Sequence, residues 1–258
     1  MTNLLLIEQL KALGLHAIAS QYPEVAKTAD LKNQTYEQFL GTLTAIEYAA
    51  KNELKIKRIK KEAKIPLIKT IESYDFKDVT GIRTEDLVRL AKGDFLKEAI
   101  NLVFFGSFGV GKTHLAMALA ERLCESGFKC YFTSVHDLIE NMLLSKKHLE
   151  LAQLFKRLDK YDLIVCDELG YIPQTEDGAN LFFQLISQRA ERKSLLITTN
   201  LTYSEWDKVF INQLNTAAAV DRIIHKCETY NIKGPSGRQA EAKKRQAMTN
   251  SLTPMQTQ

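Results

Sequence analysis

The 258-residue sequence lacks the patterns that mark zinc-binding, secreted and membrane-spanning proteins. It has only four cysteines and no C-x-x-C pair, so it predicts neither a zinc site nor a disulfide framework, and the cysteines are expected to be small buried apolar residues. No apolar run approaches the roughly 18 residues that a membrane span requires. The short run Leu4–Ile7 has no basic leader and does not fit a secretory signal. We therefore expect a cytoplasmic protein, whose 45% hydrophobic content suffices for one sizeable α/β domain and a smaller appendage.

What the sequence does have is a complete phosphate-binding loop. It matches G-x-x-x-x-G-K-[ST] and consists of Gly106, Ser107, Phe108, Gly109, Val110, Gly111, Lys112 and Thr113. The apolar stretches 101–105 and 113–120 supply the strand and the helix that such a loop needs. The glycines let backbone N–H groups approach phosphate oxygens at a helix N-terminus, Lys112 would reach the β- and γ-phosphates, and Thr113 would be a ligand of Mg²⁺. The pattern thus predicts an ATP site, the alternative being a glycine-rich turn with an incidental lysine.

A pair of acidic residues follows a second apolar run. Residues 161–166 read as a buried parallel strand, and Asp167 and Glu168 come directly after it. In this Walker B arrangement Asp167 would hold Mg²⁺ and Glu168 would polarise the attacking water. The alternative is a pair of solvated carboxylates at the start of a loop. The phosphate loop earlier in the chain favours the Walker B interpretation over this alternative.

Asn200 and Arg222 are further candidates for catalysis. Asn200 follows the predicted strand 194–199, which is expected beside the phosphate-loop strand. From there it would orient the lytic water, although the same spacing suits a turn residue. Arg222 lies in a predicted helix before the last strand, where an arginine could reach a neighbouring subunit's nucleotide as an arginine finger or simply pair with a surface acid. Arg189 and Arg192 carry the same ambiguity.

Basic charge is concentrated in one segment, residues 51–64. It holds seven basic and two acidic residues, an excess of five positive charges in a chain whose net charge is +4. A charge run of this kind is usually a solvated helix face, and contact with nucleic-acid phosphates is the more specific interpretation. The candidates for DNA contact are Lys55, Lys57, Arg58, Lys60, Lys61 and Lys64.

The periodicity predicts a helical N-terminal domain and an α/β core. The capping box formed by Thr35 and Gln38 begins a long helix over 35–63, after helices near 3–12 and 15–28. From about residue 99, strands at 101–105, 128–133, 161–166, 194–199 and 227–232 alternate with helices, as in a three-layer sandwich around a parallel sheet. Trp206 is expected in its core. The predicted organisation is 1–67 as the N-terminal helical domain, 68–98 as connector, 99–233 as ATPase core and 234–258 as a polar tail.

Four stretches together resemble the IstB family of transposition helper ATPases, which are related within the AAA+ ATPases to the helicase loader DnaC and the replication initiator DnaA. The stretches are Gly106–Ala116, Asp162–Pro173, Gly178–Arg189 and Thr198–Trp206. The resemblance covers nearly the whole chain, including the N-terminal helices and the connector. It implies a P-loop AAA+ fold, Asn200 as sensor 1 and Arg222 as the finger.

The resemblance also implies a function: ATP-bound oligomers that assemble on duplex DNA, deform it, and recruit or activate a partner transposase. Two departures qualify it. Few residues follow the last predicted strand, so no full C-terminal lid is expected, and Gly237 stands where an aromatic residue would be expected. A helicase loader would share every motif, and an ATP-gated DNA-binding module with negligible hydrolysis and a small-molecule kinase are further alternatives.

Overall fold

The computed structural model describes residues 2–171, 175–210 and 213–237, with no account of the side chains of residues 2–3 and 213–215. The chain divides into two compact units, Met1–Arg58 and Ile59–Gln258. The division lies inside the long helix α3 (Tyr36–Ala63), whereas the sequence suggested a boundary after residue 67. The last turn of α3 and the connector 68–98 therefore belong to the same compact unit as the α/β core.

The N-terminal unit is helical. Its helices are α1 (Thr2–Ala12), α2 (His16–Leu31) and the greater part of α3. The predicted capping box is present, because Thr35 N–H donates to Gln38 Oε1 at 3.0 Å and Gln38 N–H donates to Thr35 Oγ1 at 3.3 Å. Two of the backbone donors that a helix N-terminus leaves without partners are satisfied in this way.

The core of the second unit is a parallel sheet. Its strands are β1 (Asn101–Gly106), β2 (Cys130–Ser134), β3 (Leu163–Leu169), β4 (Ser194–Thr199) and β5 (Cys227–Ile232). They lie in the order β2-β3-β4-β1-β5, and every pairing is parallel. Successive residues of β1 point to opposite faces, so that Leu102 and Phe104 join one apolar cluster and Val103 joins the other. Because both faces are covered, the central strands β1, β3 and β4 are almost wholly buried, whereas the edge strand β5 also carries the polar residues Glu228 and Asn231.

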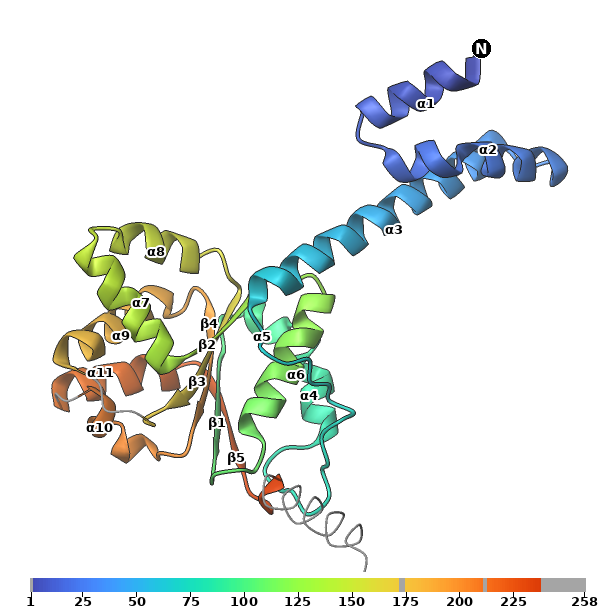
Figure 1. Ribbon diagram of the computed structural model, residues 1–258. Coiled ribbons are helices and arrows are strands. Elements are labelled where there is room, and N and C mark those ends of the chain that lie inside the picture. Colours follow the sequence, from blue (N-terminus) through green and yellow to red (C-terminus); the bar gives the residue numbers. More distant parts are fainter. Residues whose placement is uncertain (1, 172–174, 211–212, 238–258) are drawn as a thin grey trace, which may run out of the picture. The chain divides into compact units, whose positions relative to one another are not determined.

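Helices cover both faces of the sheet, as Figure 1 shows. One layer holds α4 (Thr84–Leu90), α5 (Asp94–Lys97) and α6 (Lys112–Glu125); the other holds α7 (Val135–Lys147), α8 (Leu151–Leu158), α9 (Glu176–Arg189), α10 (Asp207–Phe210) and α11 (Gln213–Ile224). The predicted three-layer α/β fold is confirmed, and Trp206 is fully buried in the second layer as expected.

Several boundaries differ from the predicted ones. A 3₁₀ turn, Tyr203–Glu205, and the short α10 lie between β4 and α11, and the four-residue α5 carried no periodic signal. The predicted strand 161–166 instead spans Leu163–Leu169, because a bulge lets the chain pair with β4 beyond Cys166. Within the described ranges, no helix combines the length and the apolar character needed to cross a membrane. The predicted tail is described only as far as Gly237; its remainder, on which the expectation of an incomplete lid depends, lies outside the described residues.

Candidate nucleotide-binding site

The strand order brings the two nucleotide-binding motifs to one edge of the sheet. The phosphate loop follows β1, the acidic pair lies near the end of β3, and β4 runs between these two strands. In parallel strands the carboxyl ends share one edge, where ligands bind in open α/β sheets. The prediction that strand 194–199 lies beside the phosphate-loop strand is confirmed, since Phe105 of β1 pairs with Thr199 of β4.

The phosphate loop has the backbone that its glycines allow. Gly109 and Gly111 have φ of +83° and +94°, in the left-handed region that favours glycine. A side chain at Gly106 would lie 2.3 Å from the carbonyl oxygen of Ile232, which leaves no room for one. Lys112 is only 8% exposed, and its ammonium donates to the carbonyl oxygens of Gly106 and Ser107 at 2.8 and 2.9 Å. The lysine charge is therefore held at the concave loop in which a phosphate would lie.

Asp167 is held by two hydroxyl groups. Its Oδ1 accepts a hydrogen bond from Thr113 Oγ1 at 3.0 Å and another from Thr198 Oγ1 at 2.5 Å. The carboxylate belongs to a residue that is only 5% exposed, so these hydrogen bonds stabilise its charged form in a poorly hydrated place. Thr113 and Asp167, the two predicted metal ligands, are thus in direct contact.

Glu168 has an unusual backbone conformation. Its φ is +63°, in the left-handed region that few residues other than glycine adopt, and its N–H donates to Thr198 Oγ1 at 2.9 Å. The bulge in β3 places it here, because the register with β4 shifts between Cys166 and Leu169. The half-buried Glu168 side chain lines the same cavity as the phosphate loop. Strained backbone of this kind is concentrated at functional sites, where it directs a side chain toward the chemistry.

The cavity has a volume of about 590 Å³ and is the size of a small-molecule site. Lys112, Thr113, Glu168 and Thr198 line it, together with residues of the connector and of the segment after β5. Oxygen donors of the kind that Thr113 and Asp167 offer suit Mg²⁺, and the glycine backbone of the loop suits phosphate. The residues present therefore fit Mg²⁺ and ATP: Thr113 and Asp167 would hold the metal, and the loop would hold the phosphates.

The remaining catalytic candidates lie outside this cavity. Asn200 follows β4 directly but does not line the cavity, and its buried Oδ1 accepts no hydrogen bond within the described part of the chain. Arg222 is exposed on α11, with its guanidinium 5.0 Å from the centre of the Phe183 ring and donating to the carbonyl oxygen of Ala218 at 3.2 Å. Arg222 therefore does not reach the cavity of its own chain, whereas Asn200 directly follows Thr199, which lines the cavity.

Arg189 does not suit the role of an arginine finger. It is 2% exposed and donates to the carbonyl oxygens of Leu158, Tyr161, Asp162 and Ser194. Burial lowers its pKa to about 10, which still leaves the guanidinium charged at neutral pH. Arg189 is therefore a core residue that joins α8, the turn before β3 and the start of β4, and it cannot reach a neighbouring molecule.

Arg192, the other alternative for the finger, lies on the surface. Its guanidinium pairs with the carboxylate of Asp159 at 3.2 Å. The side chain is more than half exposed, as expected of a surface ion pair that contributes little to stability.

The cationic segment is not uniformly solvated. Ile59 and Ala63 are buried in the apolar cluster beside α6, and Lys60 pairs with Glu121 and Glu125 at 2.7 and 2.9 Å. Burial alone would lower the pKa of Lys60, but the two carboxylates outweigh it and raise the pKa above its ordinary value.

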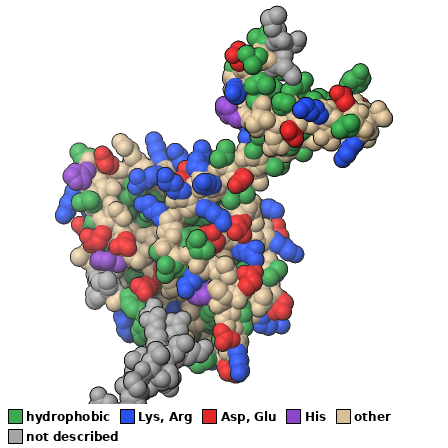
Figure 2. Space-filling view, turned by 45° about the vertical axis from the view of Figure 1, so that its right-hand side comes forward, with side chains coloured by type: hydrophobic (Ala, Val, Ile, Leu, Met, Phe, Trp, Pro, Cys, Tyr) green, Lys and Arg blue, Asp and Glu red, His purple; other side chains and the backbone are tan. Residues whose placement is uncertain are grey.

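The other candidates for DNA contact are exposed. They are Lys55, Lys57, Arg58, Lys61 and Lys64. The Lys64 ammonium lies 5.6 Å from the centre of the Tyr131 ring. Figure 2 shows Lys and Arg side chains gathered at the upper end of the core.

Two contributors to the site carry no motif in the sequence. Thr198 holds Asp167, and Tyr74, from the connector, donates its hydroxyl to the carbonyl oxygen of Val110 at 2.5 Å. A pair of threonines at the end of a buried strand before Asn200 is a weak signal for the first. No local pattern distinguishes Tyr74 from a packing aromatic.

With this geometry in place, comparison with known proteins identifies the family. The family model described as IstB-like ATP binding protein matches residues 8–247, so the chain belongs to that family of ATP-binding P-loop proteins with the AAA+ fold. A Sinorhizobium fredii relative whose name assigns it to an insertion sequence and to ATP binding is 34% identical over 90% of this chain and 78% of its own length.

Solved structures support the fold. The DnaC helicase loader is 25% identical, with a TM-score of 0.56, over 64% of this chain and 96% of its own. The AMPPCP-bound DnaA from Aquifex aeolicus is 16% identical with a TM-score of 0.53, over 76% of this chain and 58% of its own, a likeness that concerns the fold alone.

Proposed function

We propose that this protein is a Mg²⁺-dependent ATPase that assembles on duplex DNA in its ATP-bound state and recruits or activates a transposase for insertion at a target site. The observation that carries the proposal is that Lys112, Thr113 and Glu168 line one cavity, with Asp167 hydrogen-bonded to Thr113, in a chain of the IstB-like family. Relatives named for insertion sequences support the connection with transposition.

The proposed chemistry divides the work among the residues of the site. Thr113 and Asp167 would hold Mg²⁺, which when bound would neutralise charge on the phosphates. Lys112 supports the β- and γ-phosphates, and Glu168 polarises the attacking water as general base. Asn200 orients that water as sensor 1, and Arg222 stabilises transition-state charge from a neighbouring subunit. The exposure of Arg222, away from its own cavity, supports a role between subunits.

Duplex DNA is the proposed macromolecular ligand. The exposed cations Lys55, Lys57, Arg58, Lys61 and Lys64 supply the proposed contacts with phosphates. Such contacts release condensed counterions and do not depend on base sequence.

Loading a replicative helicase is the second candidate function, favoured by the similarity to the DnaC helicase loader. It uses the same ATP site with a different partner. Binding to a purified replicative helicase, compared with binding to a purified transposase of an insertion sequence, distinguishes the two.

The decisive experiment combines duplex DNA with a slowly hydrolysed ATP analogue and images the product by electron microscopy. We expect filaments or rings on DNA with the analogue and none with Lys112→Ala, which removes the charge that the loop holds. Monomers on DNA under all conditions contradict the assembly step. If the assembled protein does not hydrolyse ATP in single-turnover experiments, the protein is an ATP-gated DNA-binding module and not an ATPase.

A further inference from the structure

Two carbonyl groups of the phosphate loop are held from outside the loop. The carbonyl oxygen of Val110 accepts the Tyr74 hydroxyl at 2.5 Å, and that of Gly109 accepts the N–H of Gly237 at 3.0 Å. In a planar trans peptide the C=O and the following N–H point to opposite sides. A donor fixed on the Val110 carbonyl therefore also fixes the direction of the Gly111 N–H, which is one of the groups that a phosphate loop offers to its ligand.

The Tyr74 ring occupies the space that Gly111 leaves open. A side chain at Gly111 would lie 2.4 Å from Cε2 of this ring, in addition to the strain of a φ of +94°. The ring also contacts Phe76 and His114 edge to face, with centroids 4.8 and 5.3 Å apart. Gly111 is thus required both by the turn of the loop and by the aromatic ring packed on it.

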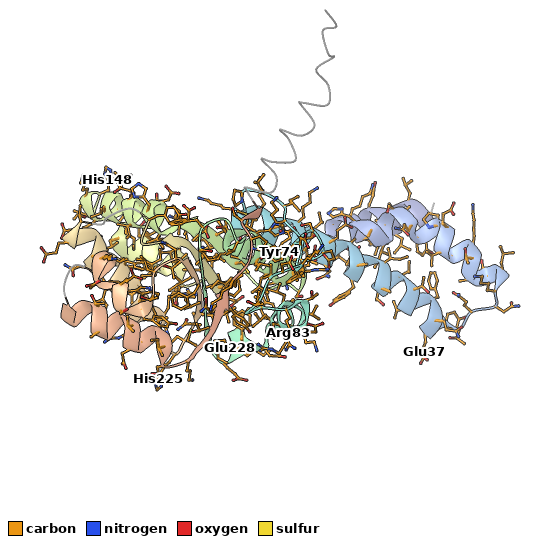
Figure 3. The ribbon with its side chains drawn as sticks, turned by 90° about the horizontal axis from the view of Figure 1, so that it is seen from below. Glu37, Tyr74, Arg83, His148, His225 and Glu228 are labelled. Carbon is orange, nitrogen blue, oxygen red and sulfur yellow. The ribbon has the colours of Figure 1, made fainter. Side chains whose placement is uncertain are left out.

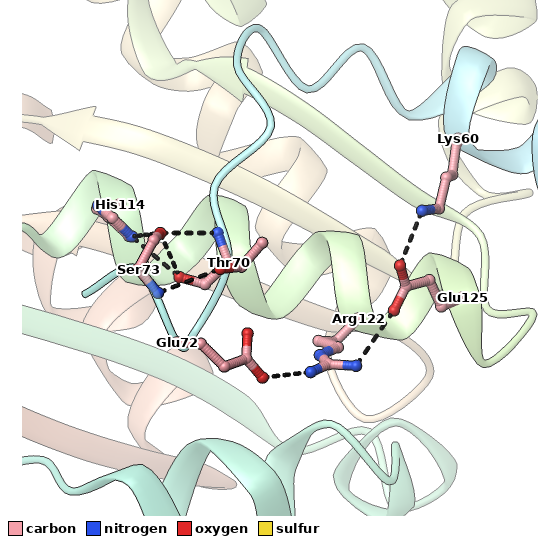
Figure 4. Close-up of polar contacts among 7 residues, drawn as sticks. All are labelled: Lys60, Thr70, Glu72, Ser73, His114, Arg122 and Glu125. Atoms are coloured by element: carbon pink, nitrogen blue, oxygen red, sulfur yellow. Dashed lines mark hydrogen bonds and ion pairs between the residues drawn. The ribbon is translucent and has the colours of Figure 1, made fainter.

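The connector that carries Tyr74 is itself attached to α6, as Figure 4 shows. His114 Nε2 lies 3.1 Å from both Ser73 Oγ and the carbonyl oxygen of Thr70, and Arg122 pairs with Glu72. These contacts are made by residues that come just before Tyr74 in the chain. In Figure 3 Tyr74 lies within the body of the core, whereas His148 lies at its periphery.

We propose that Tyr74 is a positioning residue for nucleotide binding, acting through the Val110–Gly111 peptide. This inference rests on the proposed ATP site and assigns it a support that lies outside the phosphate-loop motif. Tyr74 acts on the direction of a phosphate-binding N–H, and Lys112, Asp167 and Glu168 keep their contacts without it. Its removal is therefore expected to weaken binding of the nucleotide while leaving the chemical step at saturating ATP intact.

The test is Tyr74→Phe in the full-length protein, with a fluorescent ATP analogue and Mg²⁺. The variant keeps the ring over Gly111 and removes the hydroxyl, so we expect the Kd of the analogue and the KM for ATP to rise by about 2- to 10-fold, the range for one lost hydrogen bond. The value of kcat is expected to stay within about twofold, since binding common to ground and transition states affects KM alone.

Two control variants separate this effect from a general loss of packing. Tyr203→Phe removes another tyrosine hydroxyl of the core, which lies 2.9 Å from Thr229 Oγ1 and outside the cavity. Glu72→Gln weakens the pairing of the same connector with Arg122, while the contacts of His114 with Ser73 and Thr70 still hold the connector and Tyr74 keeps its hydroxyl on Val110. Both are expected to bind the analogue as the wild type does.

Hydrogen exchange of the Gly111 amide in the nucleotide-free protein gives a second readout. It is measured at a temperature at which thermal unfolding experiments show every variant to be folded. Faster exchange confined to the loop is expected for Tyr74→Phe. Three results overturn the role of Tyr74: an unchanged Kd for Tyr74→Phe, a loss of kcat in this variant without a rise in KM, or an equal loss of affinity in the two control variants. Failure of the wild type to bind the analogue instead overturns the proposed ATP site.

Discussion

Thr198 on β4 donates its hydroxyl to Oδ1 of Asp167 on β3 at 2.5 Å, and both residues are buried. The same hydroxyl accepts the N–H of Glu168 at 2.9 Å. One side chain therefore orients the proposed metal-binding carboxylate and fixes the backbone of the proposed general base. This arrangement depends on β4 lying next to β3, which the sheet order provides.

Replacing Thr198 by valine removes both interactions while keeping the shape of the side chain. Partners that orient a metal-binding carboxylate typically contribute about 10- to 100-fold to metal affinity or activity, so we expect a loss of that size in Mg²⁺-dependent ATP hydrolysis. A Mg²⁺ titration of the hydrolysis rate measures it. The control is Thr133→Val on β2, a buried threonine whose hydroxyl donates to the carbonyl oxygen of Ser134. Equal rates for the two variants contradict a specific role for Thr198.

Glu168→Gln separates nucleotide binding from hydrolysis. Asp167 and Thr113 still hold Mg²⁺, but the attacking water loses its base, and removal of a positioned base typically slows a reaction by about 10²- to 10⁴-fold. We expect normal binding of Mg²⁺ and ATP together with strongly reduced turnover, measured as phosphate release at saturating ATP. Turnover close to that of the wild type assigns the base to another residue.

Mixing two inactive variants tests Arg222. We expect Arg222→Ala to bind ATP and hydrolyse it poorly, and Lys112→Ala to lose nucleotide affinity. In a mixture, interfaces that combine an intact pocket with an intact Arg222 recover part of the activity when the arginine acts between subunits. Failure of the mixture, with co-assembly demonstrated by pull-down of differently tagged variants, points instead to a structural role through Phe183 and α11.

The sequence predicted those parts of the molecule that depend on local pattern. The strand at 194–199 was located to the residue because its apolar run ends abruptly, and its place beside the phosphate-loop strand followed from the ATPase pattern. The bulge at Glu168 and the contact between Thr198 and Asp167 depend on the register between two strands about 30 residues apart, which no single segment encodes.

Lys60, in the cationic segment 51–64, is a second case in which the local sequence pattern does not predict a contact. The sequence shows that Lys60 belongs to the basic run. The charge of Lys60, however, is neutralised by Glu121 and Glu125 of α6, which only the fold brings close to it.

The cationic segment can be tested by comparing lysines with different surroundings. Each phosphate contact that is lost should lower the slope of log affinity against log salt by about 0.9, equally for all DNA sequences. For Lys55→Gln combined with Lys61→Gln we therefore expect a slope smaller by about 1.8, because both lysines are exposed. Lys60→Gln is the matched control, since Glu121 and Glu125 already hold its charge, and its slope should match the wild type.

The measurement is duplex-DNA affinity over a salt series with an ATP analogue present. Glutamine retains helix propensity, so binding of the analogue should be unaffected in all three proteins. An unchanged slope for the double variant makes this segment a solvated helix face and moves the search for DNA contacts to the ATPase core. An equal reduction in the Lys60 control contradicts the distinction between paired and exposed lysines, because it shows that a phosphate competes successfully with two carboxylates.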